Sequence, residues 1–206
     1  MSLTVITVIN QETNVVSTLA SVLESTYKPH TYCVVIGKEC SDKTKESVLV
    51  LVKGCCGVET KQTTEDSGIV YETNLNGVNL ICVLSNLENS NVKGLYSLAI
   101  SKTVDFSKNY VILNQGVSIS ENGLRLLDDK LSNPVIGFVY SDYIQNNVYR
   151  YVGNFHYLIR NKVNIVSYGL KASLINETLK IDPFDIASTV YNTAIVSKIP
   201  QPVFAL

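Results

Sequence analysis

Two short apolar runs near the start of the chain, with a helical pattern between them, limit the folds that this sequence can adopt. Residues 3–9 read LTVITVI, and residues 32–36 read YCVVI before Gly37. Short runs of this kind, rich in β-branched residues, predict buried strands. Strand, helix and strand within about 35 residues is the length of a parallel crossover unit, so the sequence predicts an α/β fold. The apolar residues at helical spacing are Val15, Val16, Leu19, Val22 and Leu23.

The same alternation continues along the chain. Asn76-Gly77, the dipeptide favoured in type I′ turns, separates two β-rich runs within residues 69–84 and predicts a hairpin. Residues 110–113 and 136–143 read as further buried strands. Capping residues and helical periodicity predict helices at residues 42–52, 92–102, 120–131 and 182–192.

The expected architecture is therefore one α/β domain over residues 1–206. It has a mostly parallel central sheet flanked by helices, with a β-hairpin insertion. Ser41 or Asp42 is the expected cap of the second helix, Ser120 caps the fourth, and Asp182-Pro183 begins the last.

Composition excludes several classes of function. The 206 residues carry 17 basic and 18 acidic side chains, and a net charge of -1 gives no footprint for nucleic acid or an anionic membrane. No apolar stretch approaches the length of a membrane span, and the first residues lack the features of a signal peptide. Five cysteines, an odd count, predict reduced thiols in a cytoplasmic protein, and two histidines argue against a Cys/His zinc site.

Common catalytic motifs are absent. Residues 37–44, GKECSDKT, lack the glycines of a P-loop, and neither G-x-G-x-x-G nor G-x-S-x-G occurs. His156 lies on an alternating segment and is interpreted as a structural or surface histidine. Asp128 and Asp129 are neighbours within a predicted helix, where side chains at i and i+1 do not face each other, so we expect a solvated helix face.

Three segments, in order, resemble one known family. Residues 3–46 are similar to the opening of family 2 glycosyltransferases, which runs strand, P-x-Y-N-E, helix, L-x-S-L-x-x-Q-T-Y, strand, V-D-D-G-S-x-D-G-T. Residues 131–143, LSNPVIGFVYSDY, and residues 196–204, VSKIPQPVF, resemble later segments of that family. The residues in register within the first segment are Asn10, Glu12, Leu19, Ser21, Leu23, Thr26, Tyr27, Val35, Asp42 and Thr44.

This resemblance implies the GT-A nucleotide-diphospho-sugar transferase fold, which is Rossmann-like. It implies a nucleotide-diphosphate sugar, for example a UDP-sugar, as donor, and a glycan or other hydroxyl compound as acceptor. In the family an acidic pair after the second strand holds the nucleoside. A D-x-D holds Mg²⁺ or Mn²⁺ on the diphosphate, whose charge must be neutralised as it leaves. A later Asp deprotonates the acceptor in inverting members.

The sequence departs from the family at each of these positions. The acidic pair falls on Gly37 and Lys38, and the D-x-D falls on Asn114-Gln115-Gly116. Amide oxygens can bind a hard cation, but without carboxylate charge the site is weak, so Mg²⁺ or Mn²⁺ is not assigned as a cofactor. The family's E-D-Y-D-L falls on residues 182–186, which places a proline at the base position unless the alignment slips by one residue to Asp182.

The sequence therefore leaves two functions open. One is sugar transfer from a nucleotide-diphosphate sugar, and the other is a catalytically inactive GT-A-like domain that serves as a binding or assembly module. A homo-oligomer and a partner chain that supplies missing residues both stay open. The candidate catalytic residues are Asp182 and Asp142, no metal ligand is assigned, and the candidate donor-binding residues are Asn10, Glu12, Gly37, Lys38 and Asn114.

Overall fold

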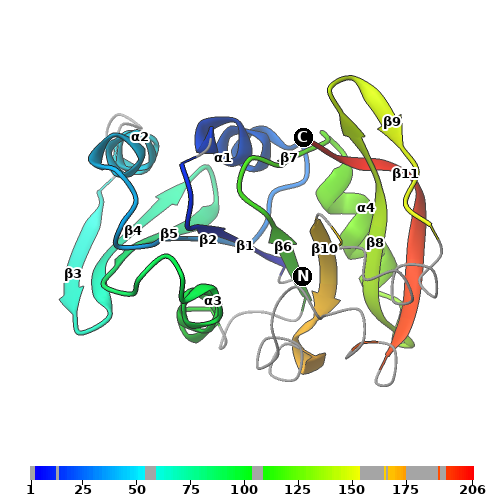
Figure 1. Ribbon diagram of the computed structural model, residues 1–206. Coiled ribbons are helices and arrows are strands. Elements are labelled where there is room, and N and C mark those ends of the chain that lie inside the picture. Colours follow the sequence, from blue (N-terminus) through cyan, green and yellow to red (C-terminus); the bar gives the residue numbers. More distant parts are fainter. Residues whose placement is uncertain are drawn as a thin grey trace.

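The computed structural model describes residues 3–12, 14–53, 59–103, 109–153, 165, 167–174, 190 and 194–206. Among them, the strands form one sheet in the order β3-β4-β5-β2-β1-β6-β10-β8-β11-β7, with β9 paired to β8 (Figure 1). The strands are β1 (Leu3–Ile9), β2 (Thr31–Ile36), β3 (Lys61–Glu65), β4 (Gly68–Leu75), β5 (Val78–Ser85), β6 (Asn109–Leu113), β7 (Ser118–Ile119), β8 (Ile136–Gln145), β9 (Val148–Arg150), β10 (Ser167–Lys171) and β11 (Ile195–Ala205).

The centre of the sheet is parallel, as predicted. β5, β2, β1 and β6 lie side by side in parallel pairs. Every residue of β1 and β2 is buried, because both faces of these strands are covered, and this explains their unbroken apolar runs. Beyond β5 and β6 the pairs with β4 and β10 are antiparallel, so the sheet as a whole is mixed.

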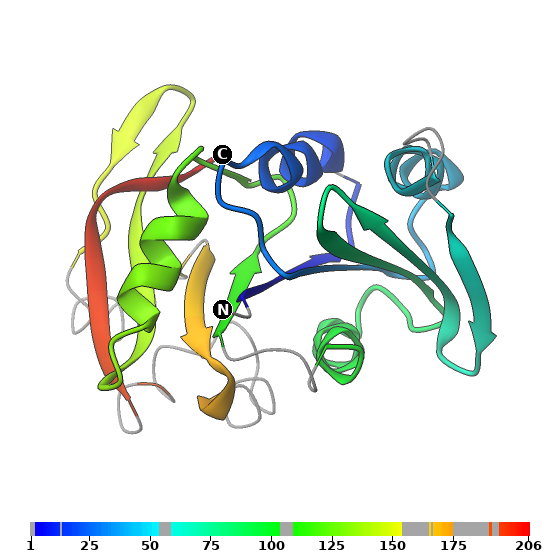
Figure 2. The ribbon, with the colours of Figure 1, turned by 180° about the vertical axis from the view of Figure 1, so that it is seen from behind.

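Helices cover both faces of the sheet. α1 (Val15–Glu24), α2 (Asp42–Lys53) and α4 (Gly123–Leu131) pack into the apolar core on one face. α3 (Val92–Ser101) packs into the core on the other face, through Leu95, Tyr96, Ala99 and Ile100. Figure 1 shows α1 and α2 above the sheet and α3 below it, and Figure 2 shows α4 from behind.

The predicted hairpin is present at Asn76-Gly77. Both residues have positive φ, 51° and 84°, as a type I′ turn requires. The hairpin is built into the central sheet, because residues 79–84 of β5 also pair in parallel with β2. It thereby carries β4 and β3 to the edge of the sheet.

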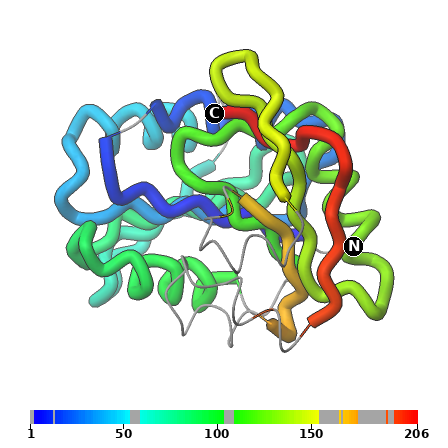
Figure 3. Tube along the Cα trace, turned by 45° about the vertical axis from the view of Figure 1, so that its right-hand side comes forward, coloured from blue at the N-terminus to red at the C-terminus, as the bar shows by residue number. Residues whose placement is uncertain are grey.

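The C-terminal part of the sheet brings together segments that are far apart in sequence. β11 runs parallel to β8, and β10 lies antiparallel on the other side of β8 (Figure 3). The predicted strand at residues 136–143 is confirmed. His156 and the predicted helix at residues 182–192, with Asp182, lie outside the described residues except Val190.

Of two predictions for the fourth helix, the cap is wrong, and the solvated face is confirmed for Asp129, which is exposed, but is wrong for Asp128. Asn122, not Ser120, is the residue before α4, since the Ser120 amide donates to the Val203 carbonyl (2.8 Å) and continues the strand pairing of β7. Asp128 is buried (2% exposed) instead of solvated, and its carboxylate accepts hydrogen bonds from Tyr27 Oη (2.5 Å) and Asn109 Nδ2 (2.8 Å). A polar residue on an inner helix face thus ties α4 to its neighbours.

No helix within the described part of the chain is long and apolar enough to cross a membrane.

Candidate functional site

The carboxyl ends of β1, β2, β5 and β6 meet at one edge of the sheet (Figure 1). From β1 the chain moves outward to β2 and β5, and it then returns to place β6 on the opposite side of β1. The order of the strands therefore reverses between β1 and β6. In open α/β sheets the crevice beyond the strand ends at such a reversal is the usual ligand site.

A tight turn after β6 contacts the loop after β1. The Val117 amide donates to the Asn114 carbonyl (3.1 Å), and Gly116 has a φ of 77°, which is the pattern of a type II turn. The turn presents Gln115 towards β1. Its Oε1 accepts hydrogen bonds from two consecutive backbone amides, those of Asn10 (2.9 Å) and Gln11 (3.2 Å).

The residue before Gln115 is anchored on the other face of the sheet. Asn114 Oδ1 accepts from Tyr96 Oη of α3 (3.2 Å), and the Asn114 amide donates to Ser167 Oγ (3.1 Å). Burial raises the pKa of Tyr96, so its hydroxyl stays protonated as the donor of this bond.

These residues do not fit a divalent cation. Asn114, Gln115 and Gly116 carry no carboxylate, and both amide oxygens already accept hydrogen bonds from protein donors. Hard cations need several oxygen ligands, preferably charged. The described ranges also contain no group of three or more His, Cys, Asp or Glu side chains placed to hold a metal ion.

The end of β2 is filled by a side chain from the loop after β5. A Cβ atom added to Gly37 would lie 2.2 Å from Asn89 Oδ1, far inside van der Waals contact. Asn89 is held there by a reciprocal pair with Glu39, in which each backbone amide donates to the other's side-chain oxygen (3.1 and 3.2 Å). The Asn89 carboxamide thus occupies the space that a side chain at position 37 would need.

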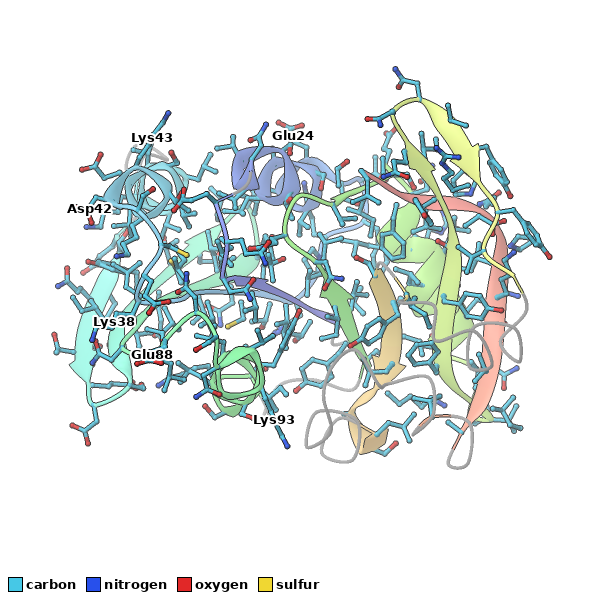
Figure 4. All side chains as sticks on the ribbon, in the orientation of Figure 1. Glu24, Lys38, Asp42, Lys43, Glu88 and Lys93 are labelled. Carbon is cyan, nitrogen blue, oxygen red and sulfur yellow. The ribbon has the colours of Figure 1, made fainter. Side chains whose placement is uncertain are left out.

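Lys38 lies at the outer rim of this edge. Its side chain is exposed, and its ammonium group forms no ion pair with any described residue. The backbone is fixed, since the Lys38 amide donates to the Leu87 carbonyl and its own carbonyl accepts from Lys45 Nζ (both 2.9 Å). Figure 4 shows Lys38 beside Glu88 at the rim, while Lys43 lies on α2.

Glu12 ties the loop after β1 to the start of α2. Its carboxylate accepts from the Ser41 amide (2.6 Å), Ser41 Oγ (3.0 Å) and Thr44 Oγ1 (2.6 Å). These bonds, from Thr44 first and then Ser41, lower the pKa of Glu12. Ser41 Oγ also accepts from the Thr44 amide (3.2 Å), which confirms the predicted cap. A contact of Glu12 with a donor stays a prediction.

Asp142 lies on β8, with β6 and β10 between β8 and β1. Its carboxylate is fully buried and 2.6 Å from Lys198 Nζ, and it accepts hydrogen bonds from Tyr149 Oη and the Val152 amide (2.7 Å). Burial raises the pKa of Asp142, but the bonds from Lys198, Tyr149 and Val152 together outweigh it and hold the pKa below its ordinary value.

The structure thus brings Asn10, Gly37, Lys38 and Asn114 to one edge, and Asp142 lies at the same edge but two strands beyond β6. Asn89 was missed from the sequence. Its signal in the sequence is its place in the loop after β5, four residues beyond Ser85, because the loops that follow parallel strands share one edge.

The protein has the GT-A-like glycosyltransferase fold. The whole chain superposes on residues 1–349 of TarS from S. aureus with a TM-score of 0.69 at 12% identity and covers 60% of that chain. The same enzyme fragment in complex with UDP-GlcNAc gives a TM-score of 0.68 at 12% identity and 58% coverage. The chain therefore spans about three fifths of the TarS fragment. No protein-family model and no curated protein matches the sequence.

Proposed function

We propose that this protein is a glycosyltransferase-like protein of the family 2 type. It binds a nucleotide-diphosphate sugar beyond the carboxyl ends of β1 and β6 and transfers the sugar to a glycan or other hydroxyl acceptor. The observation that carries the proposal is the GT-A-like fold over the entire chain, with the loops after β1, β2, β5 and β6 gathered at the strand reversal. TarS structures contain UDP and UDP-GlcNAc, which favours a UDP-sugar as the donor.

The proposed donor contacts are Asn10, Gly37, Lys38 and Asn114, with Glu12 as a residue that positions the loop after β1. Because the D-x-D position reads Asn-Gln-Gly, the donor diphosphate is bound without a metal ion held there. Backbone amides and exposed lysine supply the positive charge instead.

In an inverting transfer, the acceptor hydroxyl oxygen bonds to the anomeric carbon as the bond from that carbon to the diphosphate oxygen breaks. The electron pair leaves with the nucleoside diphosphate, and the hydroxyl proton passes to a base. We assign Asp182 this role over Asp142. The lowered pKa of Asp142 and its pairing with Lys198 make it a poor proton acceptor.

A second candidate function is favoured by the side chains that fill the edge. Asn89 occupies the space beside Gly37, and Gln115 holds the amides after β1. These contacts are compatible with a catalytically inactive domain that binds a glycan, a second copy or a partner chain.

We also propose that the protein is a single domain located in the cytoplasm. The free thiols of Cys33, Cys40 and Cys82 support this location.

Asp182→Asn distinguishes the two functions. If Asp182 is the base, the variant should release UDP from UDP-GlcNAc at least ~100-fold more slowly than the natural protein, with an unchanged melting temperature. Asp185→Asn, in the same segment, is the matched control and should retain turnover. Unchanged turnover in Asp182→Asn would refute its assignment, and no turnover by the natural protein with any nucleotide sugar would favour the binding module.

A further inference from the structure

Two consecutive backbone amides converge at the centre of the candidate site. The N–H groups of Asn10 and Gln11 directly follow β1, and both point at one oxygen, Gln115 Oε1, at 2.9 and 3.2 Å. Successive backbone N–H groups aimed at one point form a concave site for an anion or another oxygen acceptor. Here the two amides lie at the strand reversal, the usual place of a ligand in open α/β sheets.

The surroundings of these amides include both a helix N-terminus and the carboxylate of Glu12, the residue after Gln11. α1 begins at Val15, shortly after Gln11, and Asn14 at its start makes no side-chain hydrogen bond to the first amides of the helix. The first turn of α1 also contains no acidic residue. The positive end of this ten-residue helix therefore favours an anion near the loop, while the Glu12 carboxylate opposes one.

The present occupant of the site is the side chain of Gln115. Gln115 is half-buried, and its carboxamide reaches the two amides from the turn after β6, whose own hydrogen bond runs between Asn114 and Val117. Asn10 is additionally held by its side chain, which donates from Nδ2 to the Asn89 carbonyl (3.4 Å). The Asn10 side chain thus anchors the loop independently of Gln115.

We propose that the Asn10 and Gln11 amides form an oxygen-binding site for the nucleotide, which Gln115 Oε1 occupies in the free protein and a ligand oxygen takes over on binding. This inference rests on the proposed function. The oxygen comes either from a phosphate group or from a carbonyl of the base, and the two sources share the same chemistry. Gln115 then competes with the ligand, so its removal strengthens binding, unlike the removal of an ordinary contact residue.

The test is titration calorimetry of Gln115→Ala and Gln115→Glu with UDP, uridine and inorganic diphosphate as probes. Gln115→Ala frees two amides and should bind UDP about tenfold more tightly than the natural protein. Gln115→Glu keeps an oxygen on the amides and adds negative charge, so it should bind UDP about tenfold more weakly. Gln62→Ala, on the exposed edge strand β3, is the matched control and should bind UDP as the natural protein does.

The three probes identify the source of the oxygen. A gain with UDP and diphosphate assigns a phosphate, and a gain with UDP and uridine assigns the base. Amide hydrogen exchange gives an independent readout: exchange at Asn10 and Gln11 should be faster in Gln115→Ala and slow again when the probe binds. Gln115→Asn, whose shorter side chain falls back from the amides, should repeat the gain if Gln115→Ala does not fold.

The results of these titrations distinguish a failure of the proposed oxygen-binding site from a failure of the proposed function. Diphosphate binding by Gln115→Ala without nucleotide binding by any variant supports the site and contradicts nucleotide-sugar transfer. UDP binding by the natural protein with equal or weaker binding by Gln115→Ala and Gln115→Asn overturns the site and leaves the proposed function standing. No binding of any probe to any variant overturns both.

Discussion

Replacing Lys198 with methionine is expected to destabilise the folded protein by about 3–5 kcal/mol. Lys198 Nζ lies 2.6 Å from a carboxylate oxygen of Asp142, whose side chain is fully buried. Removing the ammonium group leaves that carboxylate buried without its counter-charge, which is the costly way to break a buried pair. Urea denaturation measures the loss. Lys61→Met, which removes an exposed lysine 4.0 Å from Glu72, is the control and should cost less than about 1 kcal/mol.

The pair also fixes how stability depends on pH. The folded pKa of Asp142 lies below its ordinary value, so the unfolded state binds this proton first as the pH falls. Its contribution to stability is present above the ordinary aspartate pKa of about 3.9 and is lost as the pH drops through the lower folded pKa. In Lys198→Met the folded pKa of Asp142 should rise towards its ordinary value, so the variant should lose less stability than the natural protein as the pH falls. An identical acid profile in both proteins, or a loss of under 1 kcal/mol at neutral pH, would contradict the assigned pairing.

Gly37→Asp, which introduces the carboxylate that the glycosyltransferase resemblance leads one to expect, should destabilise the protein by about 1–3 kcal/mol. Its Cβ would lie 2.2 Å from Asn89 Oδ1, so Asn89 must swing out and give up its paired hydrogen bonds with Glu39. Thermal or urea denaturation gives the change. Lys38→Asp adds a carboxylate at the adjacent exposed position and should change stability by less than about 0.5 kcal/mol.

A double-mutant cycle tests the cause of this effect. Asn89→Gly removes the clashing carboxamide, so Gly37→Asp should cost much less in that background, with a coupling energy of about 1 kcal/mol or more. Additive effects of the two substitutions would show that Asn89 does not fill the space beside Gly37.

Much of the fold could be predicted from the sequence, because a strand that is buried on both faces has apolar residues at successive positions. β1 and β2 lie at the centre of the sheet and read as unbroken apolar runs. The turn at Asn76-Gly77 was predicted because both positions need positive φ. The direction of a strand cannot be read from its sequence, because side chains alternate between the two faces in the same way in either direction. The antiparallel pairing of β10 with its neighbours was therefore not predicted.

Elements and contacts that depend on a distant partner were not predicted. β3 reads KQTTE and is mostly exposed, so it carries no apolar signal and forms because β4 offers an edge to pair with. The burial of Asp128 depends on Tyr27, about a hundred residues away in sequence. The candidate site could be predicted in part. The residues after β1, β2 and β6 could be placed at one edge of the sheet from the sequence. That Asn89 occupies the space beside Gly37 follows only from the tertiary structure.

The most direct test of the proposed function is titration calorimetry of the natural protein with UDP, with and without Mn²⁺. We expect UDP to bind and Mn²⁺ to change its dissociation constant by less than tenfold, about 1.4 kcal/mol, since the turn after β6 offers amides and no carboxylate. A gain of tenfold or more with Mn²⁺ would contradict metal-independent donor binding. The absence of UDP binding, with GDP and CMP also inert, would contradict a nucleotide-sugar site at this edge.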